Sequence, residues 1–293
     1  MSNNASSDSD RYRKSDYPQE TLNEKNYYYA GFFAAEMSCC VIKAANSNPV
    51  GHYSFKVDIT VSNADKNLLK EINAVVMRNG GVISPIKGGF NLSARGKKRV
   101  QVVLNFLDQY PIIAGDLARN RLALVREALV YLETHRGSTK HQAKSKVMGD
   151  IRMKLRSIKE TGVALHSYGQ KYASKDSIGY FLAGVLDGDG SFGLKRSADY
   201  RQPYIAIAMK DQKVIELLRE FIQHGNIRRR KDGVYHYEIN HRRVLQDVCS
   251  LFLTRYPLRH AEQRERMQHL QRILNDYTRN SAPVRVSAPA EVI

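Results

Sequence analysis

Two carboxylates close a short apolar segment near the middle of the chain, in the stretch YFLAGVLDGDGSF, which runs from Tyr180 to Phe192. Asp187 and Asp189 are separated by one glycine and followed by another, so the segment predicts an apolar helix that ends on paired acids. This ending fits two interpretations. One is an ordinary capped core helix; the other is a helix that presents a carboxylate to a divalent cation, because Mg²⁺ prefers carboxylate and carbonyl oxygens.

A second segment of the same kind, YYYAGFFAAEMSCC, runs from Tyr27 to Cys40, and aligning AGFFAAEMS with AGVLDGDGS places Glu36 against Asp189. The small residues in both segments would let two helices pack closely, which requires no ligand. A symmetric pair of helices would also bring the two acids together, and two close carboxylates repel each other unless a cation lies between them. Paired metal sites act on phosphodiesters by stabilising the attacking and leaving oxygens.

The order of patterns after the first segment is repeated after the second. An alternating, strand-like stretch follows each segment, from His52 and from Pro203, and a helix pattern that opens with an acid comes next, with Asp65 and Asp211 as predicted N-caps. Two short strands around a glycine turn and a helix that ends in Tyr-Pro complete each copy. The predicted fold is therefore α+β, a pseudo-symmetric duplication of an α-β-β-α-β-β-α unit with two antiparallel sheets.

Composition divides the chain into five parts. Residues 1–24 are rich in Ser, Asn and Asp and predict a disordered tail, while residues 279–293 are rich in Pro and Ala and predict a flexible one. The two copies of the unit are predicted at 25–162, which includes a basic helical segment, and at 177–278. A linker at 163–176 joins them.

The charge balance indicates a polyanionic partner. Forty-six Lys and Arg against 29 Asp and Glu give a net charge of +17, which favours nucleic acid or an anionic membrane surface. No apolar run is long enough to span a membrane, the first 20 residues are too polar for a secretory signal peptide, and three cysteines form neither a disulfide framework nor a zinc spacing. An intracellular protein is expected.

The segment LAGVLDGDGSF (Leu182 to Phe192) resembles the motif of the LAGLIDADG homing endonucleases, and Tyr29 to Ser38 resembles a diverged second copy. The resemblance extends over about residues 26 to 277. It implies that the two motif helices pack at the interface of two halves, whose sheets form a saddle over the major groove of double-stranded DNA. It also implies an organellar or bacterial cytoplasmic location.

The resemblance further implies that the last acid of each motif binds the catalytic divalent metals, Mg²⁺ or Mn²⁺, helped by the backbone carbonyl before it. Those acids are Glu36 and Asp189, with the carbonyls of Ala35 and Gly188. Asp187 is interpreted as local capping.

The implied activity is that of a monomeric, intron-encoded endonuclease that cuts both strands of a long asymmetric DNA site by metal-assisted hydrolysis. Several positions depart from the family pattern. Ala34 stands where an acid is common, and Met37 replaces a glycine and could crowd a phosphate. Asp116 and Glu262 stand where a lysine is frequent, and Ser62 and Met209 stand near the strand position where a polar residue such as Gln is common. Arg119 and Arg264 are candidates to substitute for those lysines. The departures favour the alternative of a cleavage-deficient maturase that binds intron RNA, and a transcriptional regulator on the same scaffold is a third possibility.

Side chains suited to base and phosphate contacts lie on the strands of both halves. In the first half the candidates are Lys43, Asn46, Lys56, Asp58, Thr60, Lys87, Asn91, Ser93 and Arg95. In the second half they are Lys195, Arg196, Arg201, Gln202, Lys210, Arg228, Arg229, Arg230, Tyr235, Tyr237 and Asn240. The run from Arg228 to Lys231 is the strongest of these signals, because four adjacent cations repel each other unless an anion is near.

Overall fold

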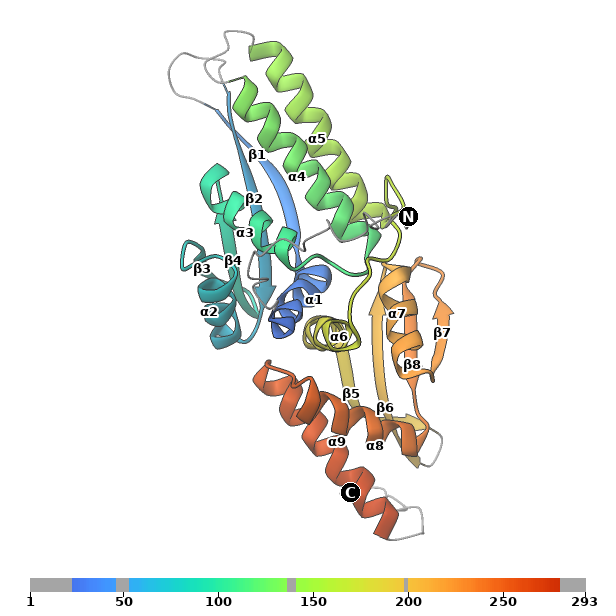
Figure 1. The fold of residues 1–293 in the computed structure, drawn as a ribbon. Helices are drawn as coiled ribbons and strands as arrows, with labels where there is room; N and C mark the ends of the chain where they lie inside the picture. Colours follow the sequence, from blue (N-terminus) through green and yellow to red (C-terminus); the bar gives the residue numbers. More distant parts are fainter. Residues whose placement is uncertain (1–22, 46–52, 136–140, 198–199, 280–293) are drawn as a thin grey trace, which may run out of the picture.

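The computed structural model describes residues 23–45, 53–135, 141–197 and 200–279 (Figure 1). These residues form two units, and each contains one four-stranded antiparallel sheet. No helix among them is long and apolar enough to cross a membrane. The predicted terminal tails, 1–24 and 279–293, lie almost entirely outside the described residues.

The first unit begins with a 3₁₀ turn, η1 (Glu24–Asn26), and its sheet has the strand order β1-β2-β4-β3. Its further elements are, in chain order, α1 (Tyr27–Glu36), β1 (Ser38–Ala45), β2 (Tyr53–Asn63), α2 (Lys66–Val75), β3 (Val82–Ile86), β4 (Gly89–Arg95), α3 (Lys97–Gln109), α4 (Asp116–Thr134) and α5 (His141–Thr161).

The second unit repeats this order, and its sheet runs β5-β6-β8-β7. Its elements are α6 (Lys175–Asp189), β5 (Gly190–Ser197), β6 (Tyr200–Met209), α7 (Gln212–Ile222), β7 (Asn226–Arg229), β8 (Tyr235–Ile239), α8 (Arg242–Ser250), the π-helical η2 (Leu251–Arg255) and α9 (Ala261–Arg279). The predicted α-β-β-α-β-β-α duplication is confirmed. After its Tyr-Pro pair, each unit continues into a helix that the predicted unit did not contain. This helix is α4 in the first unit and α9 in the second.

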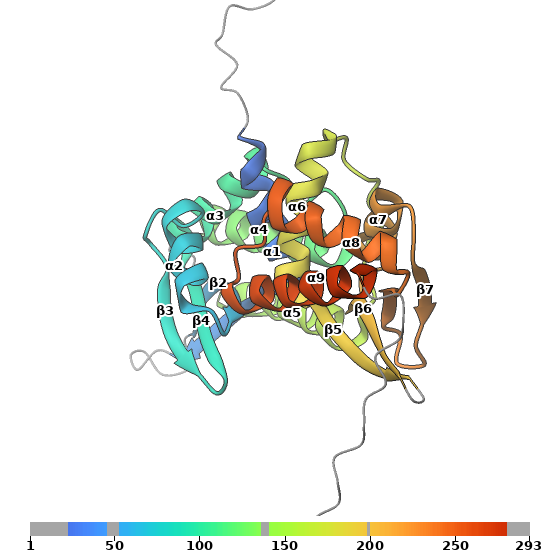
Figure 2. The same cartoon turned by 90° about the horizontal axis from the view of Figure 1, so that it is seen from below.

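Alternation along the strands gives each sheet one apolar and one polar face. Val57, Ile59 and Val61 of β2 are buried in the core, while the residues between them point to the other face. β6 behaves in the same way through Ile205 and Ile207. Seen from below, the two sheets stand on either side of the paired helices α1 and α6 (Figure 2).

The helices α1 and α6 pack so closely that their backbones touch. A Cβ atom added to Gly184 would lie 1.9 Å from the Tyr28 carbonyl oxygen, and one added to Gly31 would lie 1.8 Å from the Phe181 carbonyl oxygen. Only glycine permits this approach at either position. The small residues of both segments therefore do what their pattern predicted, and they bring the C-terminal ends of the two helices together.

Two aspartates connect the units in a pseudo-symmetric manner. Asp65 caps α2 by accepting from Asn67 N and Leu68 N, as predicted, and its other oxygen accepts from Ala261 N at the start of α9 (2.9 Å). Asp211 stands at the N-cap of α7 without a capping bond to that helix, and it accepts from Leu117 N at the start of α4 (2.8 Å). Each unit thus holds the start of the helix that follows the Tyr-Pro pair of the other unit.

Candidate metal site and nucleic-acid interface

Glu36 and Asp189 are the final residues of α1 and α6, so the crossing of these helices places the two carboxylates side by side. The backbone of Gly188 comes so close to the first helix that an added Cβ would lie 2.7 Å from Ala35 Cβ and 3.1 Å from Glu36 Cγ. Within the described residues, neither carboxylate accepts a hydrogen bond or forms an ion pair. A close, half-buried pair of acids without cationic partners is a donor set that suits a hard divalent cation.

The electrostatics of the pair agree with this geometry. Burial, and the neighbouring Asp189 carboxylate, raise the pKa of Glu36 to about 8. Burial also raises the pKa of Asp189 to about 6. No group of three or more His, Cys, Asp or Glu side chains suited to a metal ion occurs in the described part of the chain. A cation at this position would therefore complete its shell with backbone carbonyls, such as those of Ala35 and Gly188, and with water or phosphate oxygens.

Asp187 does not cap its own helix, and its interpretation as local capping is wrong. Its side chain is buried, and its Oδ2 accepts from the Tyr28 hydroxyl (2.6 Å), Arg259 N (2.6 Å) and His260 N (3.0 Å). It therefore joins the first motif helix to the segment that precedes α9. The reason is topological: α1 and the start of α9 both pack on the face of α6 that carries Asp187.

The residue that follows each motif acid is held by a side chain of α4 or α9. Met37 is buried in the core, at 2% exposure, so it does not crowd the site as expected; its carbonyl accepts from Arg121 Nη1 (3.0 Å). The equivalent carbonyl of Gly190 accepts from Gln263 Nε2 (2.8 Å). These two side chains hold the backbone next to the two acids, and no local sequence pattern marks either of them.

The positions where lysine was expected have other roles. Asp116 accepts from Tyr168 N (2.8 Å) and pairs with Lys213 Nζ (3.0 Å), which ties the linker and α7 to the start of α4. Glu262 pairs with Arg266 on the surface of α9. Arg119 donates to the backbone carbonyls of Ile112, Ile113 and Gly169, so it does not replace a lysine beside the acids.

The polar face of the first sheet carries most of the predicted contacts. Directly paired strand residues share a face, and the register assembles them here. The face is formed by Cys40, Lys56, Asp58, Thr60, Ser62, Asn91, Ser93 and Arg95. Asp58 is buried beneath an ion pair with Arg95 (2.9 Å), and Ser62 donates to Asn91 (2.6 Å). Lys87 is exposed in the turn between β3 and β4.

The polar face of the second sheet is assembled by the same rule. It contains Ser191, Lys195, Gln202, Tyr204, Asn226, Arg228, His236 and Glu238. Lys195 forms an ion pair with Glu238, so each sheet carries one cation–carboxylate pair at its centre. Ser191, Tyr204, Asn226, His236 and Glu238 were not predicted, and the strand register is the signal that locates them.

Several predicted contact residues lie elsewhere. Tyr237 is fully buried, and Tyr235 packs against the core, because their partners on β6 are Ile207 and Met209. The residues that the register places on the helix-facing side of a strand are Lys43, Arg196, Arg201 and Arg229. Lys210 donates to the Glu160 carbonyl (2.9 Å) and Arg230 pairs with Asp232. Asn240 is exposed just beyond β8, and Asn46 lies outside the described residues.

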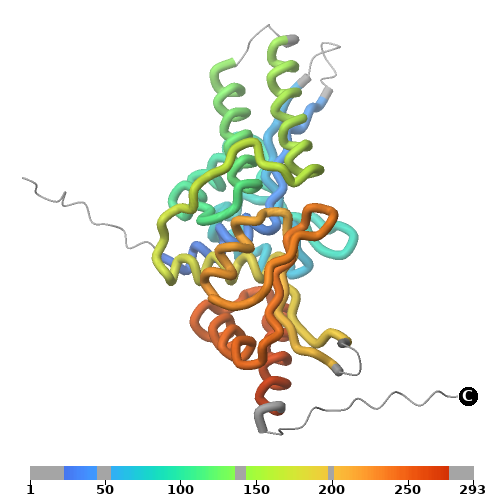
Figure 3. The backbone as a smooth tube through the Cα atoms, turned by 90° about the vertical axis from the view of Figure 1, so that its right-hand side faces the viewer, coloured from blue at the N-terminus to red at the C-terminus, as the bar shows by residue number. Residues whose placement is uncertain are grey.

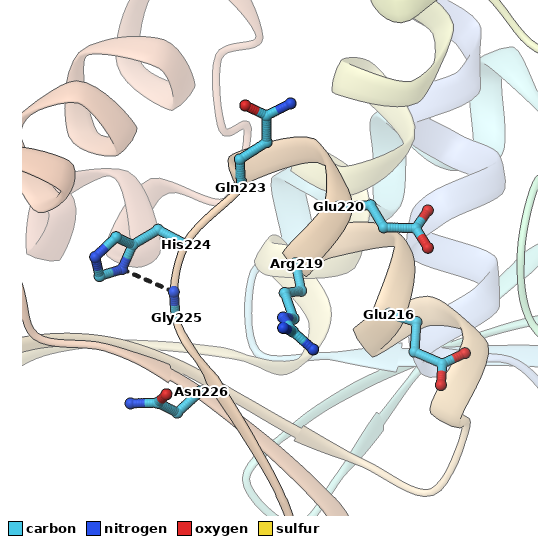
Figure 4. A pocket seen from close by; sticks show the side chains of 7 residues that line it. All are labelled: Glu216, Arg219, Glu220, Gln223, His224, Gly225 and Asn226. Atoms are coloured by element: carbon cyan, nitrogen blue, oxygen red, sulfur yellow. Dashed lines mark hydrogen bonds between the residues drawn. The ribbon is translucent and has the colours of Figure 1, made fainter.

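A separate pocket lies at the C-terminal end of α7, where the chain leads into β7 (Figure 4). Glu216, Arg219 and Glu220 line it from the helix, and His224 accepts from the Gly225 amide (2.7 Å) at its mouth. Its seven lining residues include Asn226 of the polar sheet face but none of the motif helices, so it forms no part of the acid pair's surroundings.

Two sheets that flank a pair of crossed, acid-tipped helices define the architecture of the single-chain homing endonucleases. The fold is similar to I-GzeII in complex with its DNA target (TM-score 0.72, 15% identity, 87% of this chain and 91% of that chain). It is also similar to I-SmaMI bound to cleaved DNA (TM-score 0.71, 18% identity, 87% and 90% covered) and to I-SmaMI bound to uncleaved DNA with calcium ions (TM-score 0.70, 18% identity, 87% and 92% covered).

The sequence match supplies the family. Residues 182–273, which span most of the second unit, match the model of the LAGLIDADG endonuclease family. No curated protein matches the sequence. The match assigns the second unit to this family, and the first unit repeats the fold of the second.

Proposed function

We propose that the protein is a metal-dependent, sequence-specific endonuclease that cuts both strands of a long asymmetric DNA site. The observation that carries the proposal is the half-buried pair of Glu36 and Asp189 carboxylates at the end of the α1–α6 crossing, which have no hydrogen-bond or ion-pair partner among the residues that the structure describes. Holding two such groups in contact costs stability, and groups of this kind are typical of functional sites, where a bound cation offsets their repulsion. The family match and the solved complexes of the similar proteins with DNA support the choice of substrate.

In this proposal the two carboxylates hold Mg²⁺ or Mn²⁺ with the carbonyls of Ala35 and Gly188. A divalent cation bound there supplies Lewis-acid stabilisation of the phosphate oxygens and lowers the pKa of a coordinated water. Arg121 and Gln263 keep the backbone beside the two acids in place through Met37 O and Gly190 O. The buried surroundings of the pair exclude bulk water from the ligating oxygens.

The polar sheet faces position the duplex. A β-ribbon fits the major groove, and Arg, Lys, Asn and Gln side chains form base contacts there. The two faces carry different side chains at equivalent places, for example Asp58–Arg95 on one and Lys195–Glu238 on the other. A single chain with two unlike faces reads an asymmetric site and has no need of a second copy.

A second candidate function is binding without cleavage, on intron RNA or on DNA. The observation that favours it is the acid at both positions where family members often carry lysine, Asp116 and Glu262, of which the first is fully engaged in holding the linker. In the described residues no lysine is paired with Glu36 or Asp189. Without such a lysine, only a bound cation would stabilise the charge that develops during cleavage, which favours binding without cleavage.

Cleavage of a randomised duplex library separates the two functions. The wild-type protein with Mg²⁺ is compared with Glu36→Gln and Asp189→Asn. Glu220→Gln is the control, because it makes a carboxylate-to-amide change at an exposed residue of α7. Staggered double-strand breaks in the wild type and control, and their loss in both motif variants, are expected. Tight binding to the intron RNA without any break in DNA would replace the endonuclease with the binding function.

A further inference from the structure

The helix α5 carries an excess of positive charge that the proposed site does not use. It contains six Lys and Arg residues against two acids, Asp150 and Glu160. One side of the helix packs against the core, because Met148, Ile151 and Leu155 are buried. Since this packing fixes the rotation of the helix, the positions of its cations are fixed as well.

Three of those cations form one stripe along the helix. Arg152, Arg156 and Lys159 occupy positions i, i+4 and i+7, which lie on the same side of an α-helix. All three are exposed. We name this set the basic stripe. Lys146 and Lys154 are also exposed but lie on other sides of the same helix.

The basic stripe borders the polar face of the first sheet. α5 packs along β1 and β2, and Figure 3 shows the yellow-green helix running beside the blue β1–β2 hairpin. Cys40 on β1 lies within electrostatic range of both Arg152 and Lys159: burial raises the pKa of the Cys40 thiol, and these cations oppose that rise. Cys40 pairs with Asp58 across the strands, so the stripe continues the polar face beyond the β1 edge.

The stripe is not neutralised within the described structure. Arg156 pairs with Glu160 (2.6 Å), whereas Arg152 and Lys159 have no acidic partner among the residues described. The cations are not needed to anchor the helix either. Its buried apolar side and the Lys210 Nζ bond to Glu160 O perform that task. Exposed cations that repel one another and serve no packing role are typical of a surface that binds phosphates.

We infer that the basic stripe of α5 binds the phosphate backbone of duplex DNA beside the segment that the first sheet contacts. The inference rests on the proposed DNA-binding function and deepens it by adding a helix to the sheet surface. Contacts of this kind add affinity and fix the path of the duplex without reading its sequence. The protein would thus hold DNA on its first half through a helix as well as a sheet.

The test compares two double variants that remove the same charge from the same helix. Arg152→Gln with Lys159→Gln removes the stripe, and Lys146→Gln with Lys154→Gln is the matched control on other sides of α5. Binding to a long duplex of random sequence is measured over a range of salt concentrations. The slope of log K against log salt falls by about 1.8 in the stripe variant, because two phosphate contacts are lost, and it changes less in the control.

The outcomes distinguish the two proposals. If the wild type binds no duplex, the proposed DNA-binding function fails. If the wild type binds and the stripe variant shows the same slope as the control, only the basic stripe is refuted. A slope that falls for structured RNA while duplex DNA binding is unchanged also overturns the inference. Equal thermal unfolding of the two variants confirms that both compare folded protein.

Discussion

The buried carboxylate of Asp187 on the second motif helix accepts a 2.6 Å hydrogen bond from the hydroxyl of Tyr28 on the first. The same oxygen takes the amides of Arg259 and His260, so one side chain joins α6, α1 and the start of α9. Arg259 in turn lies over the Tyr28 ring, with its guanidinium carbon 4.6 Å from the ring centroid. The interface that aligns the two acids is therefore held by polar groups as well as by close helix packing.

The first prediction concerns this hydrogen bond. Tyr28→Phe removes the hydroxyl and leaves Asp187 with its two amide donors, which should lower the free energy of unfolding by about 1.5–3 kcal/mol, the usual range for a bond to a charged group. Chemical denaturation at pH 8, where Asp187 is ionised, measures the loss. Combined with Asp187→Leu, the two changes should be non-additive by at least about 0.5 kcal/mol.

Tyr256→Phe is the control, because its hydroxyl donates to Asp176 (2.7 Å) and does not contact Asp187. Its effect should add to that of Asp187→Leu within about 0.5 kcal/mol. Additivity for both tyrosines would mean that the Tyr28–Asp187 bond contributes nothing to the interface.

A second prediction tests the helix crossing. Gly184→Ala places a methyl group 1.9 Å from the Tyr28 carbonyl oxygen and 2.7 Å from Phe32 N, both of which are backbone atoms that cannot move aside locally. We expect the variant to lose at least about 3 kcal/mol of stability, the upper part of the range for overpacking, or to fail to fold.

The matched control is Gly149→Ala in α5, where an added Cβ meets no atom within 4 Å. Because alanine favours a helix over glycine by about 1 kcal/mol, this variant should be slightly more stable than the wild type. Thermal unfolding of the two proteins measures both effects. Similar melting of Gly184→Ala and the wild type would show that the backbones do not touch as described.

Part of this interface was predictable from the sequence. The duplicated motif and the alternation of apolar residues located both sheets and the pairing of Glu36 with Asp189. The partner of Asp187 was not predictable, because Tyr28 lies 159 residues away and nothing in its local pattern marks a bond across the helix pair. The spacing of apolar residues identifies which face of a helix is buried, but it does not identify the element that packs against that face.

The face of the sheet on which a strand residue lies was also predicted wrongly for several basic residues. Lys195 and Arg196 are neighbours in the sequence but lie on opposite faces, with Gln202 and Arg201 as their respective partners. A shift of one residue in the register would exchange them, and turn residues alone do not fix that register. Neighbouring basic residues near hairpin ends therefore cannot be divided between the two faces from the sequence alone, although only alternate residues lie on the polar face.

The third prediction concerns the pH dependence of stability without a divalent cation. The folded-state pKa of Glu36 is about 8, against 4.5 in its ordinary state, because of burial and the nearby Asp189. A raised carboxyl pKa means that the folded protein binds more protons than the unfolded chain between these values. The contribution of Glu36 is therefore most favourable below pH 4.5 and is lost as the pH rises through 8.

Denaturation midpoints measured from pH 5 to 9 check this sign. The wild type in EDTA should lose stability steadily over that range, and Glu36→Gln should flatten the profile, since the amide does not titrate. Addition of Mg²⁺ should stabilise the wild type more at pH 8 than at pH 5, because metal and proton compete for the same oxygens. An identical pH profile for wild type and Glu36→Gln would show that the carboxyl group is not buried beside Asp189.

The fourth prediction uses two adjacent arginines on β7. Arg228 pairs with His236 on the polar face of the second sheet, whereas Arg229 pairs with Tyr235 on the opposite face, and its guanidinium carbon lies 5.7 Å from that ring's centroid. Arg228→Gln should reduce the salt slope of duplex binding by about 0.9, the value for one phosphate contact, or relax the preference at one base pair. Arg229→Gln removes the same charge from the next residue and should leave both properties nearly unchanged, while lowering stability by up to about 1 kcal/mol through the lost ring contact. Filter binding over a salt series measures the slopes, and equal slopes for the two variants would mean that this face does not carry the DNA.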